Sequence, residues 1–265
     1  MQKAQTLPEL PLMTQGRYRA CLARRADDIA EAQALRTLAF GTGTTDRDDF
    51  DRHCAHILIR DRTSGEPVCC FRILLIERGG DLDHSYSAQF YELSRLKTFQ
   101  GRMLEMGRFC MHPDRHDPDI LRVAWGALTA FVDEHGVAFM FGCSSFAGTR
   151  TEDYLDAFAM LRARHLAPKQ WLPRIKAPDV FRFAARLRRQ PDVKKAMARM
   201  PPLLRTYLMM GGWVSDHAVV DHHLNTLHVF TGLEISAIPD ARRRLLRAVA
   251  GQGRVQAVDA PAQAV

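Results

Sequence analysis

The sequence lacks the patterns that define several common protein classes. No apolar run reaches the roughly 18 residues that a membrane-spanning helix needs. The N-terminus shows no basic region followed by an apolar region and a small-residue cleavage site, so an export signal is not expected. The six cysteines form no Cys-x-x-Cys pair, which disfavours a zinc or dithiol site. We therefore expect a cytosolic protein whose cysteines are reduced and mostly buried.

Motifs for metal binding and nucleic-acid recognition are also missing. Histidines are frequent in the second half of the chain, but none has His-Glu-x-x-His or similar ligand spacing. We expect no metal and no bound cofactor. No helix-turn-helix or zinc-finger pattern accompanies the basic residues, so nucleic acid is not an expected partner.

The chain does contain enough apolar material for one sizeable core, together with a surplus of positive charge. Hydrophobic residues make up 46% of the 265 positions and charged residues 25%, which is ordinary for a globular protein. The net charge of +7 favours acidic partners, such as an anionic lipid surface or an acidic carrier protein.

Hydrophobic periodicity predicts both helices and strands. A helix over 27–40 precedes strands over 55–60 and 68–76, which form a hairpin. A strand over 103–112 leads into a helix over 118–135, with Asp117 as its N-cap and Pro118 as its first residue. We also expect a buried strand over 137–143, a helix over 154–164, a basic amphipathic segment over 179–200, and strands over 206–214 and 226–235. This order predicts an α/β or α+β fold with a mixed central sheet flanked by helices.

The apolar strand that precedes the second long helix carries two charges. Glu105 and Arg108 lie three residues apart, so in a regular strand their side chains would point to opposite faces. A β-bulge at Gly107 would bring both to one face. Without a bulge, we expect Arg108 to pair with Asp48 or Asp51 across the sheet. The alternative is an edge strand whose two charges are solvated. Charges in an apolar strand are costly to bury unless they are paired or take part in chemistry, which favours a catalytic strand.

Six polar residues and two phenylalanines recur in a recognisable order and spacing. They are Arg36-x3-Phe40, Asp48-x2-Asp51, Arg72, Phe90 and Glu105-x2-Arg108. This pattern resembles that of the GNAT acyltransferases that take acyl groups from acyl carrier protein. One branch of these contains the acyl-homoserine-lactone synthases, and another the bacterial ornithine N-acyltransferases that make lyso-ornithine lipid. The stretches 104–110, 141–146 and 201–212 resemble the ornithine branch in particular.

Two departures narrow the substrates that the resemblance implies. Lactone synthases carry a tryptophan at the S-adenosylmethionine site, and the corresponding segment 41–47 contains none. The pyrophosphate loop of other GNAT enzymes is rich in glycine, whereas 115–119 has no glycine and two carboxylates. Coenzyme A presents several phosphates that need free backbone N–H groups. The loop therefore suits the single phosphodiester of an acyl carrier protein better.

The resemblance implies an enzyme that moves a 3-hydroxyacyl group from acyl carrier protein to the α-amine of L-ornithine. The same chemistry on glutamine or S-adenosylmethionine is an alternative. A non-catalytic GNAT-like module that binds lipid or a carrier protein is an alternative of another class.

Amide formation needs a base for the incoming ammonium. Glu105 is the expected base, because burial raises the proton affinity of a carboxylate.

The other charged residues of the pattern have alternative roles. Asp48 and Asp51 either recognise the cationic side chain of the acceptor or hold Arg72 and Arg108 in place. Arg36 is expected to be solvated or to tether its helix to the sheet rather than to act in catalysis.

The remaining site residues are expected to contact the acyl donor or to pack in the core. Phe40 and Phe90 either belong to the core or line a slot for the acyl chain. The resemblance further implies contacts to the acyl group or the phosphopantetheine arm from Phe109, Cys110, Met111 and Arg115. Backbone N–H groups of 109–111 would stabilise the oxyanion.

Basic residues alternate with apolar ones over 179–200. We expect this segment to contact the anionic surface of the inner membrane or to dock the carrier protein, with a solvated helix face as the alternative. The chain should then divide into a flexible arm (1–16), a GNAT-like domain (17–240) with a basic helical insertion at about 170–205, and a basic, disordered tail (241–265).

Overall fold

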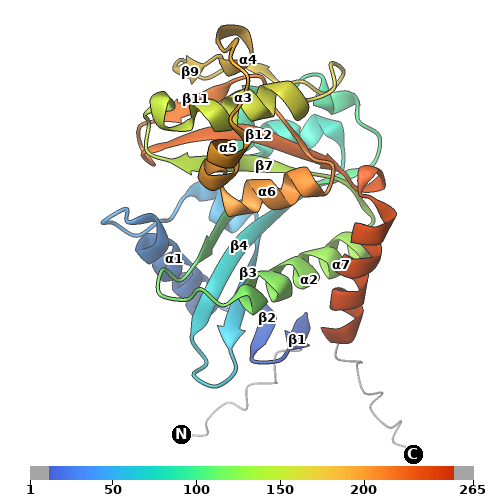
Figure 1. Ribbon diagram of the computed structural model, residues 1–265. Coiled ribbons are helices and arrows are strands. Elements are labelled where there is room, and N and C mark those ends of the chain that lie inside the picture. The colour runs from blue at the N-terminus through green and yellow to red at the C-terminus, as the bar shows by residue number, and fades with distance from the viewer. Residues whose placement is uncertain (1–11, 254–265) are drawn as a thin grey trace, which may run out of the picture.

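A mixed β-sheet with helices on both faces forms the frame of the molecule (Figure 1). The computed structural model describes residues 12–253. The strands are β1 (Met13–Gln15), β2 (Tyr18–Ala23), β3 (Ala55–Asp61), β4 (Pro67–Ile76), β5 (Tyr91–Glu92), β6 (Arg102–Met111), β7 (Val137–Ala147), β8 (Arg174–Ile175), β9 (Val180–Phe181), β10 (Trp213–Val214), β11 (Ala218–Asp221) and β12 (Thr226–Glu234). The helices are α1 (Ala26–Phe40), α2 (Pro118–His135), α3 (Leu155–Arg164), α4 (Phe183–Arg186), α5 (Val193–Arg199), α6 (Pro202–Met209) and α7 (Asp240–Gly253).

The order of strands in the main sheet is β1-β2-β3-β4-β6-β7-β12-β11-β9, and β10 also pairs with β12. β6 and β7 are parallel, and α2 makes the crossover that parallel neighbours require. The other pairs of this sheet are antiparallel. The predicted mixed sheet flanked by helices is confirmed.

Short-range sequence signals account for two of the predicted elements, the β3–β4 hairpin and α2. The β3–β4 hairpin forms as expected. α2 begins at Pro118, and the side chain of Asp117 accepts the N–H of Asp119 at 2.9 Å. The helix ends at Gly136, whose φ of 60° is the left-handed conformation that glycine adopts readily.

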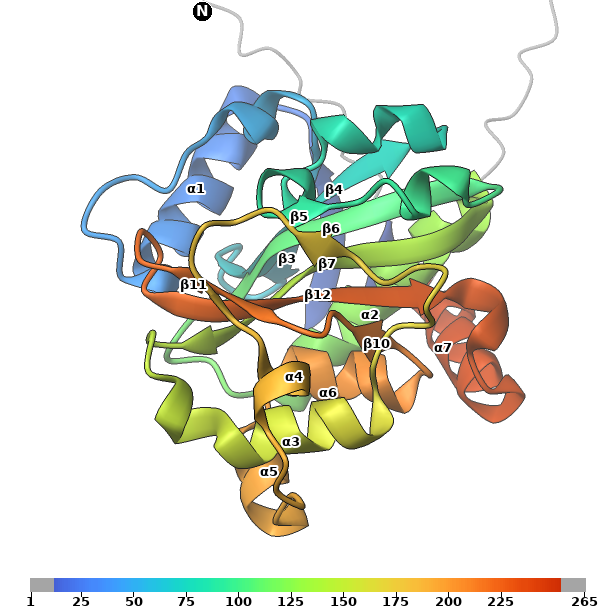
Figure 2. The same ribbon diagram turned by 90° about the horizontal axis from the view of Figure 1, so that it is seen from above.

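Alternating side chains divide the core between the two faces of the sheet. On β3, Ile57 and Ile59 pack in the cluster beneath α2, whereas Leu58 packs beneath α1. The α2 face also carries α6 and α7, and α3 packs further along it, while the segment 79–99 covers the other face beside α1 (Figures 1 and 2).

β6 and β7 pair over only part of their length. Their parallel register runs from Arg102 opposite Val137 to Glu105 opposite Phe141, and both strands then continue apart. Where they separate, a Cβ atom on Gly142 would lie 2.3 Å from the carbonyl oxygen of Met106, so only glycine fits. The separation opens a gap in the middle of the sheet.

Two predictions for the region after α3 are wrong. The predicted strand 206–214 forms only at its end, as β10, whereas 206–209 belong to α6, which starts at a proline, a residue that suits the first helical position. The basic segment 179–200 is not one helix: β9, α4 and α5 are separate, and Pro191 lies in the break before α5. Within residues 12–253, no helix is long and apolar enough to cross a membrane.

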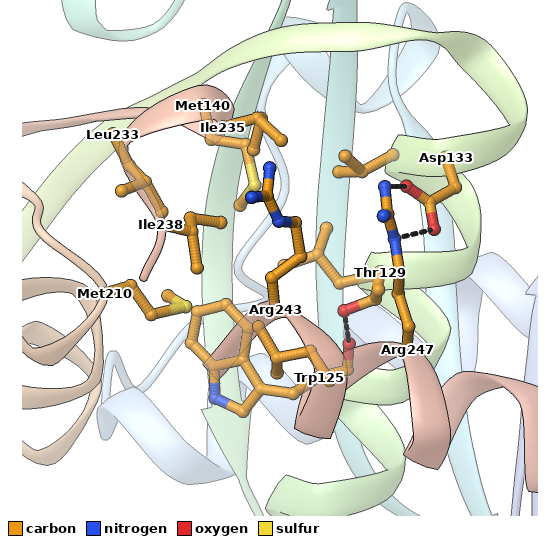
Figure 3. Close-up of a pocket in the computed structure, with 13 residues that line it drawn as sticks. Trp125, Thr129, Asp133, Met140, Met210, Leu233, Ile235, Ile238, Arg243 and Arg247 are labelled. Atoms are coloured by element: carbon orange, nitrogen blue, oxygen red, sulfur yellow. Dashed lines mark hydrogen bonds and ion pairs between the residues drawn. The ribbon is translucent and has the colours of Figure 1, made fainter. Parts of the chain in front are cut away.

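The predicted disordered tail is wrong up to residue 253, because α7 packs along α2. Arg247 forms an ion pair with Asp133 of α2 at 2.9 Å (Figure 3). Leu246 packs against the core. The small cavity left beside α7, about 30 Å³, has room for little more than one water molecule. The prediction of a flexible arm is wrong from Met13 onward, because β1 belongs to the sheet. Residues 1–11 and 254–265 lie outside the described residues.

Candidate active site

A cavity of about 650 Å³ lies at the gap between β6 and β7, a volume typical of small-molecule sites. Neighbouring residues of a strand point to opposite faces, so the two faces contribute different side chains. Polar residues line it on the α1 face, among them Tyr86, Glu105, Arg108, Cys143, Asp221 and His228. Apolar residues line it on the α2 face, which also carries α6, among them Met106, Phe146, Leu203, Leu204 and Tyr207. The cavity therefore joins a polar and an apolar compartment through the sheet.

Glu105 lies in the wall of this cavity and is almost fully buried. Its Oε2 accepts the backbone N–H of Tyr86 at 2.8 Å, and its Oε1 accepts that of Ser87 at 2.7 Å. Burial raises the pKa of Glu105, although the hydrogen bonds from Ser87 and Tyr86 act in the opposite direction. A carboxylate with a raised pKa beside an open cavity has the properties of a general base.

The β-bulge that the sequence suggested is present. Arg72 lies opposite Gly107 and Cys70 opposite Cys110, so β6 has one extra residue between these pairs. Arg108, directly after Gly107, has a φ of 53°. Its guanidinium lies 5.0 Å from the ring centroid of Tyr86. Since the Tyr86 backbone is bound to Glu105, the bulge brings both charged side chains of β6 to one face.

Three arginines and three aspartates form a buried ion network next to the cavity. They are Arg36, Arg72, Arg108, Asp46, Asp48 and Asp51. Arg36 Nη1 donates to Asp51 at 2.7 Å, Arg72 Nη2 donates to Asp48 at 2.9 Å, and Arg108 Nε donates to Asp46 at 3.2 Å. The formal charges of the six residues cancel, as the burial of so many charges requires.

The network favours one of the alternative roles of the two aspartates. The carboxylate of Asp48 binds Arg72 and Arg108, and that of Asp51 binds Arg36 and Arg72. Burial alone would raise the pKa of Asp51, but the hydrogen bonds from Arg36 and Arg72 hold it well below its usual range. Neither aspartate is among the residues that line the cavity. Both therefore hold the arginines, and Arg36 anchors α1 to the loop that carries them.

The three phenylalanines of the prediction occupy different places. Phe40 is 40% exposed and lines the rim of the cavity. Phe109 also lines it and stacks on Phe71, with ring centroids 5.6 Å apart. Phe90 lies behind the wall, against the rings of Tyr86 and His228.

Three other predicted contact residues are not brought to the cavity. Cys110 is buried beneath α1, where its Sγ lies 3.5 Å from that of Cys70. Met111 packs against the core cluster beneath α2. Arg115 pairs with Glu66 at 3.2 Å. The bulge bears on Cys110 and Met111, because the extra residue shifts which side chains of β6 beyond it face the gap, whereas Arg115 follows the end of the strand.

Sequence reasoning missed several residues of the site. Asp46 joins the ion network, and Tyr86, Asp221 and His228 line the cavity. None lies in a periodic segment with a chemical motif, so no sequence signal singles them out. Cys143 also lines the cavity, but burial raises its pKa to about 12, so it is a thiol rather than a nucleophilic thiolate at neutral pH.

The fold and the site together define an acyltransferase of the GNAT class. Residues 31–126 match the family model described as "Acetyltransferase (GNAT) domain". The chain is 31% identical to the L-ornithine N(alpha)-acyltransferase of Rhodobacter capsulatus, over 89% of this chain and 97% of the relative. It is 30% identical to the enzyme of the same name from Rhizobium meliloti, over 82% and 80% of the two chains. The chain belongs to the L-ornithine N(alpha)-acyltransferase family.

Among solved structures, an N-acyl amino acid synthase from uncultured soil microbes aligns with 89% of this chain and 98% of its own. The identity is 9% and the TM-score 0.47, which is too low to indicate a shared activity.

Proposed function

We propose that this protein transfers a 3-hydroxyacyl group from acyl carrier protein to the α-amine of L-ornithine, forming lyso-ornithine lipid. The observation that carries the proposal is the cavity through the sheet. Its apolar compartment suits an acyl chain, and its polar compartment, with the buried carboxylate of Glu105, suits an amino acid. The names of the relatives supply the acceptor.

The reaction joins the nitrogen to the thioester carbon and breaks the carbon–sulfur bond. Glu105 takes a proton from the α-ammonium, directly or through a water molecule, and the departing thiolate takes up a proton. The N–H of His112 donates to the carbonyl of Val68 at 2.9 Å. The alternation of an antiparallel pair then turns the N–H of Met111 away from β4. Met111 does not line the cavity, so the backbone N–H of Phe109, which does line it, is the better placed candidate to stabilise the oxyanion.

The preference for a carrier-protein donor is supported by the N-terminus of α2. Coenzyme A enzymes use such a helix end to bind phosphates. Here Asp117 caps the helix, and Asp119 adds a second carboxylate in the first turn. Two negative charges at this position repel a pyrophosphate.

Contact with an anionic partner is supported by the surface around α4 and α5. Val193 and Met197, one turn apart on α5, are 47% and 40% exposed and flanked by basic residues. α5 projects from the body of the molecule (Figure 2). The acylated product has to reach the bilayer, so we propose that this surface contacts the cytoplasmic face of the inner membrane.

The test is expression in a host that lacks aminolipids, followed by lipid extraction. We expect a new acylated lipid whose head group is ornithine. A glutamine head group or a lactone would move the acceptor to one of the alternatives. A folded protein that yields no acylated product, in cells or with purified acyl carrier protein thioester and ornithine, would overturn the enzymatic function.

A further inference from the structure

Asp221 and His228 line the cavity but have no part in the chemistry just described. Asp221 ends β11, and His228 lies on the neighbouring strand β12, opposite Val219. Asp221 follows Val219 by two residues, so Asp221 and His228 point to the same face of the sheet. The register of β12 on β7 and of β7 on β6 makes this the face that carries Glu105.

Asp221 is a buried carboxylate with an incomplete set of partners. It is 7% exposed, and its Oδ1 accepts the backbone N–H groups of His223 and Leu224, each at 2.9 Å. Within the described part of the chain, its Oδ2 has neither a hydrogen bond nor an ion pair. The three arginines of the ion network are already balanced by three aspartates. A cation from outside the protein would stabilise such a buried carboxylate.

His228 supplies an independent, unsatisfied acceptor in the same wall. The hydroxyl of Tyr91 donates its proton to the carbonyl oxygen of His228 at 2.8 Å. The Nδ1 of His228 lies 3.1 Å from the same hydroxyl oxygen and must therefore be the donor in that contact. This leaves the lone pair on Nε2, which is buried and lacks a partner among residues 12–253. Burial lowers the pKa of His228 to about 4, so the ring is neutral at physiological pH.

We propose that Asp221 and His228 form the subsite that binds the side-chain ammonium of the acceptor amino acid. This inference rests on the proposed function and specifies how the acceptor is recognised. A primary ammonium has three N–H donors, which can satisfy Asp221 Oδ2 and His228 Nε2 together.

The charge of the cavity favours the same acceptor. Glu105 and Asp221 are acidic, and the arginines beside them are already matched by the aspartates of the network. An amino acid with two ammonium groups and one carboxylate carries the net positive charge that such a cavity attracts. Glutamine lacks the side-chain charge and would leave Asp221 unpaired, so the subsite discriminates against it.

The experiment compares Asp221→Asn with the wild type, using ornithine and norvaline, which lacks the side-chain ammonium. Asparagine retains the oxygen that accepts the His223 and Leu224 N–H groups, so the turn should survive. Loss of one charge-assisted contact should raise KM for ornithine roughly 10- to 100-fold while kcat changes little. The preference for ornithine over norvaline should shrink by the same factor. Asp179→Asn is the matched control, because Asp179 is exposed, bonds to His222 and does not line the cavity.

Two further substitutions keep the test decisive if the asparagine variant does not fold. Asp221→Glu retains the charge but moves it inward by one methylene, so the preferred diamino acid should become shorter by one carbon. His228→Gln retains an acceptor and should bind ornithine nearly as well as the wild type, whereas His228→Leu should not. Unchanged ornithine KM and selectivity in folded variants would overturn the subsite.

Calorimetric titration of ornithine into the protein without acyl donor separates this inference from the proposed function. Binding that depends on Asp221 but leads to no acyl transfer would overturn the function and keep the subsite. Acylation of ornithine that is unaffected by Asp221→Asn would overturn the subsite alone.

Discussion

The carboxylate of Glu105 accepts the backbone N–H of Tyr86 at 2.8 Å, across 19 residues of chain. The proposed base is therefore also the tether of the segment that forms one wall of the cavity. Any substitution of Glu105 acts on both roles, so turnover alone cannot distinguish them. A pH profile measured together with stability can, because loss of the tether on protonation also destabilises the fold, whereas loss of the base alone does not.

Glu105→Gln should lower turnover by about 100-fold or more, because the amide cannot accept the proton of the ammonium. In the wild type, activity should rise with pH through the raised pKa of Glu105, and this limb of the profile should vanish in the variant. Circular dichroism and a thermal melt check that the variant is folded. Near-normal turnover in a folded variant would exclude Glu105 as the base.

Acyl carrier protein thioesters should be better donors than the matching coenzyme A thioesters by about 10-fold or more in kcat/KM. The reason is the pair of carboxylates, Asp117 and Asp119, at the N-terminus of α2. Steady-state kinetics with one acyl chain on both carriers measures the ratio. Equal values would contradict our interpretation of this helix end.

Reversal of four basic residues around α5 should abolish binding to anionic vesicles. Arg186, Arg188, Lys194 and Arg199 are exposed and form no ion pair among residues 12–253, unlike Arg189, which pairs with Asp156. Each charge near an anionic surface contributes on the order of 1 kcal/mol. Vesicle sedimentation at low salt, where the attraction is strongest, measures the binding.

A control with the same total charge separates local from general effects. Reversal of Arg19, Arg24, Arg78 and Arg244, which are exposed elsewhere, should leave most of the vesicle binding intact. Equal losses in both variants would show that net charge alone drives the binding. No loss in either variant would leave α5 as a solvated helix face.

Asp51→Asn should destabilise the fold by about 3 to 5 kcal/mol, because it leaves Arg36 and Arg72 with an uncompensated buried charge. Asp49→Asn, at an exposed position of the same turn, should change stability by less than about 0.5 kcal/mol. Urea unfolding measures both changes. Similar values for the two variants would show that the network contributes little.

The same network predicts how stability depends on pH. The pKa of Asp51 is lower in the folded state than in the unfolded chain, so the folded state holds fewer protons. Its contribution to stability is complete above the ordinary aspartate pKa of about 3.9 and is lost as the pH falls below that value. Unfolding midpoints between pH 3 and 7 should show this acid limb in the wild type, and it should be shallower in Asp51→Asn.

Gly142→Ala should destabilise the protein by about 1 to 3 kcal/mol and reduce activity, because the new methyl group collides with the Met106 carbonyl where β6 and β7 separate. Gly80→Ala is the control, since a Cβ there meets no atom within 4 Å. Thermal melts and activity measurements compare the two. A fully active and stable Gly142→Ala would show that the gap does not depend on this close approach.

Elements whose signals are local could be predicted from the sequence. The cap at Asp117, the proline at the start of α2 and the β3–β4 hairpin follow from residues within a few positions of one another. The bulge beside Gly107 and the buried Glu105 were also predictable, because charges in an apolar strand must be accommodated. α7 was missed because its stability depends on the contact of Arg247 with Asp133, 114 residues earlier.

Which carboxylates face the cavity depends on the tertiary structure. Asp48 and Asp51 belong to the residue pattern that resembles the family. Their loop folds onto Arg36, Arg72 and Arg108, so ion pairs with these arginines neutralise their charge. Asp221 and His228 carry no motif. They become candidates because pairing of β12 with β7 brings them to the gap, and because Tyr91, 137 residues away from His228, sets its tautomer. Burial and long-range pairing decide which polar groups remain unsatisfied, and spacing along the chain does not contain that information.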